Sequence, residues 1–448
     1  MQTFRHILMR RCARHLYIPV VLACLAWPAA AQITLPPLPG PALPQSPGAV
    51  GGAVQSLDLP VGSTLGLDAT LQQRVDARAL QVRTLVRANR QTLETDPAGA
   101  PLRRAELVTF SPSDAALQAA VAAGFSVQRR QALAEAGIEI VVLRAPIGLA
   151  TRRALARLRA LDPQGSYDYN HLYLQSAAAS AADTPVAAPA ATAGRGADAA
   201  GKHGGPERMA RVGMIDGGVD STHPSLATVS VERSGCDGAM LPTAHGTAVA
   251  SLVAAAAAAP DLRLALHSTD VYCGQPVGGA IDALAAAFAT LLRAQVSVIN
   301  ISLVGPRNLA LEMLVRAVQS RGVLVVAAVG NDGPAAKPLY PAALPGVVAV
   351  TGVDAKRRVL PEAGRGAQVQ FAAPGADMQA ADAKRGYGAV RGTSFAAPIV
   401  TGLLAALLSE PGCTADSALQ RLAAQAIDLG ARGRDPVYGY GLVGSALH

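Results

Sequence analysis

Three residues in the C-terminal half of the chain have the types and spacing needed to cleave an acyl bond. Asp216 directly follows the apolar stretch 211–215, His245 lies in the run Thr-Ala-His-Gly-Thr, and Ser394 lies in Gly-Thr-Ser-Phe-Ala-Ala-Pro. A serine hydroxyl is a weak nucleophile until a base removes its proton, and an imidazole can take that proton and return it to the leaving amine. A carboxylate on the other ring nitrogen would orient the imidazole and stabilise its charged form. We therefore predict nucleophilic acyl transfer.

A fourth residue, Asn331, could stabilise the charge that develops on the attacked carbonyl. It follows Gly330, directly after the apolar run 322–329. Its side-chain amide and the backbone N–H of Ser394 would donate to the oxyanion, helped by the start of the helix that Ser394 opens. Taken singly, the four residues also have structural interpretations, as a strand end, a helix start, a turn and an N-cap. Their joint occurrence favours a functional role over these four separate structural ones.

The elements that would bring these residues together begin at residue 208, where apolar runs start to alternate with helical patterns. Strands are expected at 211–215, 262–266, 296–302, 322–329 and 347–353, and helices at 245–258, 278–294 and 309–321. Strands that are apolar on both faces and separated by helices predict an α/β sandwich around a mostly parallel sheet. Ligands bind beyond the carboxyl ends of such strands, so Asp216, Ser302 and Asn331 should meet at one edge of the sheet.

With these motifs in this order, residues 207–448 resemble the subtilisin-like serine protease family, the subtilases or peptidase S8 family. The resemblance implies a three-layer α/β sandwich and a serine endopeptidase that hydrolyses peptide bonds through a Ser-His-Asp triad and an acyl-enzyme. It also implies a peptide or protein substrate, a monomer, and no cofactor. The alternative is a catalytically inactive binding or regulatory protein on the same scaffold.

The resemblance further implies that an extended substrate adds as a strand to one edge of the cleft. The residues of this edge are Ser302, Leu303, Val304 and Gly305, and those of the facing wall of the S1 pocket are Ala328, Val329 and Gly330. Family members commonly carry glycine where this chain has Val304. Its β-branched side chain should therefore narrow the cleft and leave a modest apolar pocket.

Other departures from the family pattern surround the expected triad. Gly217 replaces the Ser or Thr that usually follows the aspartate, which would loosen a supporting hydrogen bond, and Ala248 stands where many members carry a second histidine. The helix after His245 runs into Pro260 without the loop that holds calcium in many relatives. Because no cluster of Asp, Glu or Asn replaces that loop, we expect no calcium there and no other metal site.

Residues 105–177 predict a small α+β domain. Strands are expected at 106–110, 125–130, 138–143 and 167–174, and helices at 115–121 and 152–161, with Ser113 capping the first helix. This β-α-β-β-α-β order is the ferredoxin-like pattern and resembles that of subtilase propeptides. It implies an intramolecular inhibitor that assists folding, with residues 169–177 in the active-site cleft. The alternative is an ordinary accessory domain.

The N-terminus predicts export. Residues 1–31 have the basic start, the short apolar stretch at 16–27 and the Ala-Ala-Ala ending of a signal peptide, which indicates a secreted or periplasmic protein. An uncleaved N-terminus and a lipid anchor at Cys24 are the alternatives, and the bulky Leu22 argues against the anchor.

Two further segments differ in composition from the predicted domains. Residues 32–104 combine a Pro/Gly-rich stretch with a helical pattern of Leu and Arg at 65–93. Residues 178–206 are dominated by Ala, Ser, Thr and Gly, which is typical of an exposed, protease-sensitive linker. The linker would lead into the predicted catalytic domain at 207–448.

Composition excludes several other classes of protein. Hydrophobic residues make up 50% and charged residues 16% of the 448 residues, which requires a large core and rules out a disordered or fibrous chain. The net charge of +8 is not concentrated in a basic patch interleaved with aromatics, so we do not expect nucleic-acid binding. After the N-terminus no apolar run is long enough to span a bilayer.

Three cysteines follow the predicted signal peptide. An exported protein meets an oxidising compartment, where one disulfide could form. We prefer the pair Cys236 and Cys273, because both are expected in loops of the same domain, which leaves Cys413 unpaired. No Cys-x-x-Cys motif or histidine cluster accompanies them, which disfavours metal binding.

Overall fold

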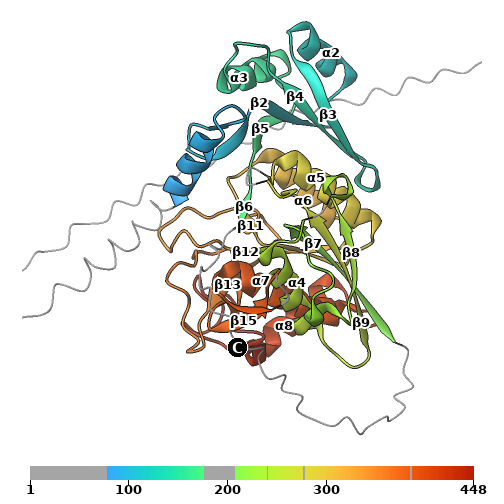
Figure 1. The fold of residues 1–448 in the computed structure, drawn as a ribbon, viewed down its shortest axis with the longest axis vertical. Coiled ribbons are helices and arrows are strands. Elements are labelled where there is room, and N and C mark those ends of the chain that lie inside the picture. The colour runs from blue at the N-terminus through green and yellow to red at the C-terminus, as the bar shows by residue number, and fades with distance from the viewer. Residues whose placement is uncertain (1–77, 176–206, 240, 276–277, 384–385, 448) are drawn as a thin grey trace, which may run out of the picture. The chain divides into compact units, whose positions relative to one another are not determined.

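The computed structural model describes residues 78–175, 207–239, 241–275, 278–383 and 386–447, all within one compact unit, Pro60–His448 (Figure 1). The predictions for a signal peptide at 1–31, for residues 32–77 and for a linker at 178–206 fall outside the described residues.

Residues 207–447 are built around a seven-stranded sheet in which every neighbouring pair of strands is parallel. The strand order is β14-β13-β12-β10-β7-β9-β8. The bounds are β7 Arg208–Asp216, β8 Ser230–Ser234, β9 Leu262–Asp270, β10 Val298–Ile301, β12 Leu324–Ala328, β13 Val348–Val353 and β14 Val369–Pro374. The five predicted strands are confirmed as the five central ones, and both edge strands were missed.

Helices cover both faces of this sheet. On one face lie α4 (Ala244–Ala257) and α7 (Thr393–Leu408), and on the other α5 (Ile281–Arg293) and α6 (Leu309–Gln319) (Figure 1). Successive strand residues alternate between the two cores: Val326 packs in the core of α4 and α7, and Val325 in that of α5 and α6. The predicted three-layer α/β sandwich is thereby confirmed.

Small side chains allow α4 and α7 to pack closely. A Cβ on Gly402 of α7 would lie 2.6 Å from the Cβ of Ala256 and 2.6 Å from the carbonyl oxygen of Val253, so only glycine fits there. This close approach suits a chain whose aromatic content is only 4%, because the core must be filled by Ala, Val and Leu. The hairpin of β15 (Met378–Ala381) and β16 (Tyr387–Val390) and the helix α8 (Ala415–Gln425) complete this part of the chain.

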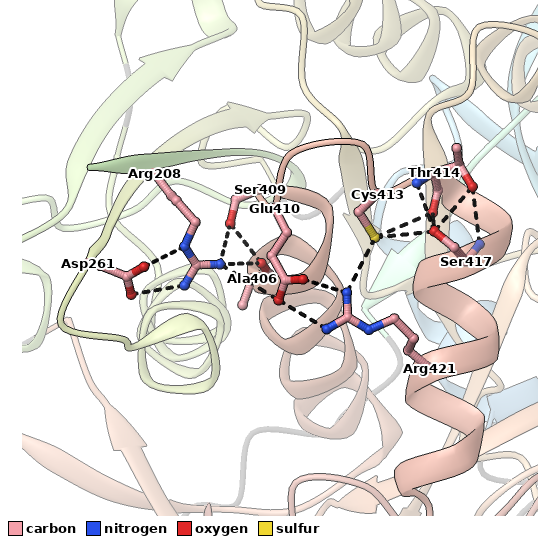
Figure 2. A network of polar contacts seen from close by, with 9 residues as sticks. All are labelled: Arg208, Asp261, Ala406, Ser409, Glu410, Cys413, Thr414, Ser417 and Arg421. Carbon is pink, nitrogen blue, oxygen red and sulfur yellow. Dashed lines mark hydrogen bonds and ion pairs between the residues drawn. The ribbon is translucent and has the colours of Figure 1, made fainter. Parts of the chain in front are cut away.

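The start of β7 is tied to the end of α7 by polar contacts of Arg208 (Figure 2). Its guanidinium donates to both carboxylate oxygens of Asp261, at 2.7 and 2.9 Å, and to Ser409 Oγ at 3.2 Å. Beyond it, Glu410 forms an ion pair with Arg421 of α8 at 2.5 Å. The polar network thus fixes the first residues of the sheet beside the C-terminal helices.

A second sheet is formed by residues 93–171. Its strands are β1 (Leu93–Thr95), β2 (Pro101–Phe110), β3 (Ser126–Leu133), β4 (Ile138–Arg144) and β5 (Tyr167–His171), and its helices are α2 (Asp114–Ala122) and α3 (Thr151–Leu161). The order β5-β2-β4-β3, with all pairs antiparallel, is the ferredoxin-like arrangement. Ser113 caps α2, as predicted, by accepting from the N–H of Ala116 at 3.1 Å.

The predicted boundary at residue 105 is too late. β1 pairs with the first residues of β2, Leu93 opposite Arg103 and Thr95 opposite Pro101, so the sheet begins by residue 93. The sequence hides this start because the run Pro-Leu-Arg-Arg has no apolar alternation. Ala105, with φ of 61°, also interrupts the pairing of β2. Upstream, residues 78–88 are helical, as the pattern at 65–93 predicted for this part.

Cys236 and Cys273 are joined in a disulfide, the pairing that the sequence analysis preferred. The bond connects the loop after β8 with the loop after β9, and Cys413 takes part in no disulfide. A disulfide stabilises mainly by restricting the unfolded chain, and more so for a longer loop.

Replacing Cys236 and Cys273 by serine is expected to lower the free energy of unfolding. The two residues are 37 positions apart, for which loop-closure entropy gives about 4 kcal/mol. Denaturant unfolding of the mature protein measures this loss. Cys413→Ser is the matched control, with an expected change within about 0.5 kcal/mol, and equal stability of both variants would contradict the prediction.

Of the helices that the structure describes, none has the length and apolarity to cross a membrane.

Candidate active site

Asp216 and His245 meet at the carboxyl edge of the sheet. Asp216 is the last residue of β7, and His245 lies in the first turn of α4, whose N-cap is Thr243. The Asp216 Oδ1 and His245 Nδ1 atoms are 2.8 Å apart. Because an ionised carboxylate can only accept, Nδ1 is the donor in this contact, and in the neutral ring Nε2 is then the acceptor. Asp216 is fully buried, and the exposed fraction of the His245 side chain is 10%.

The glycine after Asp216 supports the carboxylate through its backbone alone, because Oδ2 of Asp216 is buried without a hydrogen-bond partner among the described residues. The backbone N–H of Gly217 donates to Asp216 Oδ1 at 2.7 Å. A Cβ on Gly217 would lie 2.7 Å from Thr243 Oγ1, so the threonine that caps α4 occupies the space of the missing side chain.

Ser394 lies in the first turn of α7, fully buried beside the end of β10. Its hydroxyl donates to the carbonyl oxygen of Ser302 at 3.4 Å, and the Ser302 hydroxyl donates to the carbonyl of Ser394 at 2.9 Å. The ring of the next residue, Phe395, packs against that of His245, with the centroids 5.4 Å apart and the planes tilted by 50°. Hence the start of α7 lies directly against the histidine. Nε2 of His245 is buried and has no hydrogen-bond partner among the described residues.

Asn331 lies beside the start of α7. Its Oδ1 accepts from the backbone N–H of Thr393 at 3.1 Å, and the Thr393 hydroxyl accepts from the N–H of Gly330 at 3.2 Å. Gly330 has φ of +95°, which favours glycine at this turn. The contact with Thr393 fixes the orientation of the Asn331 amide, so that Nδ2 is its donor end.

A strand from the N-terminal part of the chain occupies the predicted substrate edge. β6 (Leu174–Gln175) pairs antiparallel with β11 (Leu303–Val304), with Leu174 opposite Val304. Gln175 Nε2 donates to Asp216 Oδ1 at 3.4 Å, so the strand leads to the Asp216–His245 pair. Gly305 continues the edge by exchanging backbone hydrogen bonds with Tyr340 at 2.9 and 3.1 Å.

The residues predicted as the facing wall are buried at the end of β12. Ala328 is its last residue, and Val329 donates its N–H to the carbonyl of Val350 at 3.1 Å. The Val304 Cγ1 atom lies 3.6 Å from the position of a Cβ on Gly330, so Val304 reaches from the edge toward this wall. Among the residues that the structure describes, no three His, Cys, Asp or Glu side chains are grouped to hold a metal ion.

Several residues near this site were missed from sequence. Tyr272 and Gly279 both contact the strand on the substrate edge, whereas Gln175 lies within the segment 169–177 that was expected in the cleft. The Gly278-Gly279 pair was the available signal, since adjacent glycines often mark a close backbone approach. No local sequence pattern around Tyr272 indicated that it lies near the site.

A buried Asp–His pair and a serine at the start of a helix, on the carboxyl edge of a parallel sheet, are features that serine-hydrolase sites share. Comparison with known proteins makes this specific. Residues 208–441 match the sequence model of the subtilase family. The chain therefore belongs to that family, whose activity is that of a serine-type endopeptidase.

Individual relatives agree with this assignment. The chain is 31% identical to subtilisin DY of Bacillus licheniformis over 248 residues, which cover 52% of this chain and 88% of that protein. It is also 31% identical to subtilisin E of Bacillus subtilis (strain 168) over 245 residues, which cover 52% of this chain and 64% of that protein, just under two thirds.

One solved structure extends the likeness of fold beyond the C-terminal half. Fervidolysin from Fervidobacterium pennivorans, a keratinolytic enzyme related to subtilisin, matches with a TM-score of 0.60 and 19% identity, covering 77% of this chain and 61% of that chain. This coverage is more than residues 207–448 could supply. At this identity the likeness concerns the fold alone.

Proposed function

We propose that this chain is an exported serine endopeptidase, made as a zymogen, in which Asp216, His245 and Ser394 form the catalytic triad. The observation that carries the proposal is the 2.8 Å contact between Asp216 and His245, with Ser394 one residue from the ring that packs on His245. The boundaries that go with it are a signal peptide at 1–31, an inhibitory domain ending near 177, a linker at 178–206 and a catalytic domain at 207–448.

Catalysis would begin when the Ser394 hydroxyl rotates from the Ser302 carbonyl toward His245. Nε2 takes the hydroxyl proton while Oγ attacks the substrate carbonyl, and Asp216 stabilises the imidazolium that forms. The imidazolium then protonates the leaving amine, and the C–N bond breaks to leave an acyl-enzyme. Water, deprotonated by the same nitrogen, attacks the ester, and the proton returns to Ser394 Oγ as the acid product leaves.

The oxyanion of both steps would be stabilised by Asn331 and by the start of α7. The Asn331 amide is fixed by Thr393, so Nδ2 can donate without reorganising. The backbone N–H of Ser394 lies in the first turn of α7, where the helix dipole favours negative charge.

Contacts between β5 and two helix starts support an inhibitory role for the N-terminal domain. Asp168 Oδ2 accepts from the N–H of Leu309 at the start of α6, at 2.9 Å. Asn170 Oδ1 accepts from the N–H of Ile281 at the start of α5, at 3.1 Å. These acceptors satisfy helix N–H groups that have no partner within the helix.

Apolar contacts also support an inhibitory role for the N-terminal domain. Val108, Ile140 and Val142, on one face of the N-terminal sheet, belong to the same core cluster as the side chains of α5 and α6. Because this domain covers both helices and its last strand fills the substrate edge, it would block substrates until it is removed.

The helix at 78–88 adds a contact at the same edge. Arg78 pairs with Asp332 at 3.1 Å and donates to the Val304 carbonyl at 3.3 Å. Burial raises the pKa of Asp332, and the positive charge of Arg78 opposes that rise. The inhibitory segment would therefore start upstream of the ferredoxin-like core, at residue 78 or before.

Two observations support export. The pattern of residues 1–31 is that of a signal peptide. The Cys236–Cys273 disulfide is of the kind that persists in oxidising compartments.

A fluorophosphonate active-site probe tests the proposal. After removal of the N-terminal domain, we expect covalent labelling of the wild-type chain and none of Ser394→Ala, because such probes react with an activated hydroxyl and the alanine has none. The control Ser320→Ala, which removes an exposed hydroxyl at the end of α6, should label normally. Absence of labelling in the wild type would favour the inactive scaffold instead.

A further inference from the structure

The turn at residues 360–364, between β13 and β14, is anchored to the sheet. The side chains of Leu360 and Ala363 are buried in one apolar cluster with Ala376. The Leu360 N–H also donates to the carbonyl of Gly352 in β13 at 2.9 Å. The turn can therefore hold neighbouring loops in a defined position.

This turn contacts the chain on both sides of Asn331. On one side, the N–H of Gly364 donates to the carbonyl of Gly330 at 3.0 Å. On the other, the N–H of Gly333 donates to the carbonyl of Glu362 at 2.8 Å. The backbone of Asn331 thus lies between two hydrogen bonds that lead to the same turn.

The side chain of Glu362 extends from the turn to the segment that precedes Ser394. Its two carboxylate oxygens lie 2.7 Å from Nε and 3.0 Å from Nη2 of Arg391, so the contact is bidentate. The exposed fraction is 7% for the Glu362 side chain and 46% for that of Arg391. Glu362 therefore joins the loop of Asn331, through its backbone, to the start of α7, through its side chain.

The start of α7 has no other side-chain contact of this kind at its cap. Gly392 is the N-cap, and it makes no side-chain hydrogen bond to the helix. Its φ of +136° lies where glycine is favoured, and glycine restricts the chain least of all residues. The guanidinium of Arg391, directly before this glycine, supplies the contact that the N-cap lacks.

We infer that the Glu362–Arg391 ion pair is a positioning element of the oxyanion hole, which sets the distance between the Asn331 amide and the Ser394 N–H. The inference rests on the proposed function, because it takes these two groups as the oxyanion donors. The contact with Thr393 orients the Asn331 amide, whereas the ion pair would fix how far apart the two loops lie. Two donors stabilise an oxyanion fully only when both reach the same oxygen.

Variants of the pair should lower kcat and leave KM within about twofold of the wild type. Glu362→Gln keeps the shape of the side chain but loses the charge that holds the guanidinium. Loss of a whole oxyanion donor costs about 10²- to 10³-fold in kcat, so a displaced donor should cost part of this, about tenfold. Arg391→Lys should cost about three- to tenfold, because an ammonium cannot match both carboxylate oxygens.

The test uses the full-length chain, matured by a trace of wild-type enzyme, and a fluorogenic peptide with the sequence of residues 170–179. Two ion pairs that do not join these loops supply the matched controls. They are Glu410→Gln, from the pair with Arg421, and Arg358→Lys, from the pair with Asp354. Both controls should keep kcat within about twofold of the wild type.

A second substitution at Asn331 shows whether the pair acts through the oxyanion hole. In the Asn331→Ala background, Glu362→Gln should lower kcat by less than about threefold more, because one of the two donors is already absent. A combined loss equal to the product of the two single losses would overturn the inference. So would a raised KM with unchanged kcat, since Arg391 would then bind the substrate directly.

Failure of the inference and failure of the proposed function give different results. If thermal unfolding shows that Glu362→Gln does not fold, Arg391→Lys, alone and combined with Asn331→Ala, decides. If the wild type does not cleave the peptide, the rate of fluorophosphonate labelling replaces kcat, because the phosphoryl oxygen would occupy the same oxyanion hole. Equal labelling rates with and without the pair overturn the inference alone. A wild-type chain that is not labelled overturns the proposed function, and the inference with it.

Discussion

Ser394→Ala is expected to abolish proteolysis and to leave the exported chain as an uncleaved precursor. The alanine removes the only atom that can form the acyl-enzyme while leaving the Asp216–His245 contact intact. In subtilisin itself, loss of the nucleophile lowers kcat by about 10⁶-fold, and we expect an effect of this order here. If the chain processes itself, the same variant cannot cleave the peptide bond that follows its own N-terminal domain.

Two measurements check this prediction. Intact-mass analysis of the exported wild type and variant gives the extent of processing, and the N-terminal residue of the wild-type product gives the site of the cut. Ser320→Ala, at an exposed helix end, should process as the wild type does. Equal processing of Ser394→Ala and the wild type would show that another protease matures the chain.

The positions of the proposed triad could be predicted because each lies where one element ends and another begins. Asp216 closes a strand that is buried on both faces, and Ser394 lies two residues after the N-cap glycine of α7. Both junctions are local patterns. The central strands could be predicted equally well, because short apolar runs rich in valine, such as 322–329, are typical of buried strands.

What the sequence did not reveal depends on contacts between distant segments. The edge strand β8, Ser-Val-Glu-Arg-Ser, is too polar for its pattern to indicate a strand, and pairing with β9 alone defines it. Tyr272 lies in a loop, and its relation to Tyr173 exists only because two domains meet there. Likewise, Thr243 fills the space beside Gly217 although the two residues are 26 positions apart in the chain. No local sequence pattern encodes such a contact.

Asp216→Asn is expected to lower kcat by about 10⁴-fold with little change in KM. Asp216 Oδ1 accepts from both His245 Nδ1 and the Gly217 N–H, and Oδ2 has no hydrogen-bond partner among the described residues. An asparagine can place its oxygen at Oδ1, but its NH₂ is then buried without an acceptor. Reversed, the NH₂ faces Nδ1, so the ring proton moves to Nε2 and the base is lost. Either orientation also removes the charge that stabilises the imidazolium.

The split between kcat and KM separates this role from a structural one. The variant chain would be matured by a trace of wild-type enzyme, then compared in steady-state kinetics and in thermal unfolding. Asp220→Asn is the matched control, because Asp220 Oδ1 accepts from the N–H and hydroxyl of Thr222, at 3.0 and 2.7 Å, and should affect kcat by less than about twofold. If Asp216→Asn kept kcat within about tenfold of the wild type, Asp216 would only shape the strand end, and His245 would act without it.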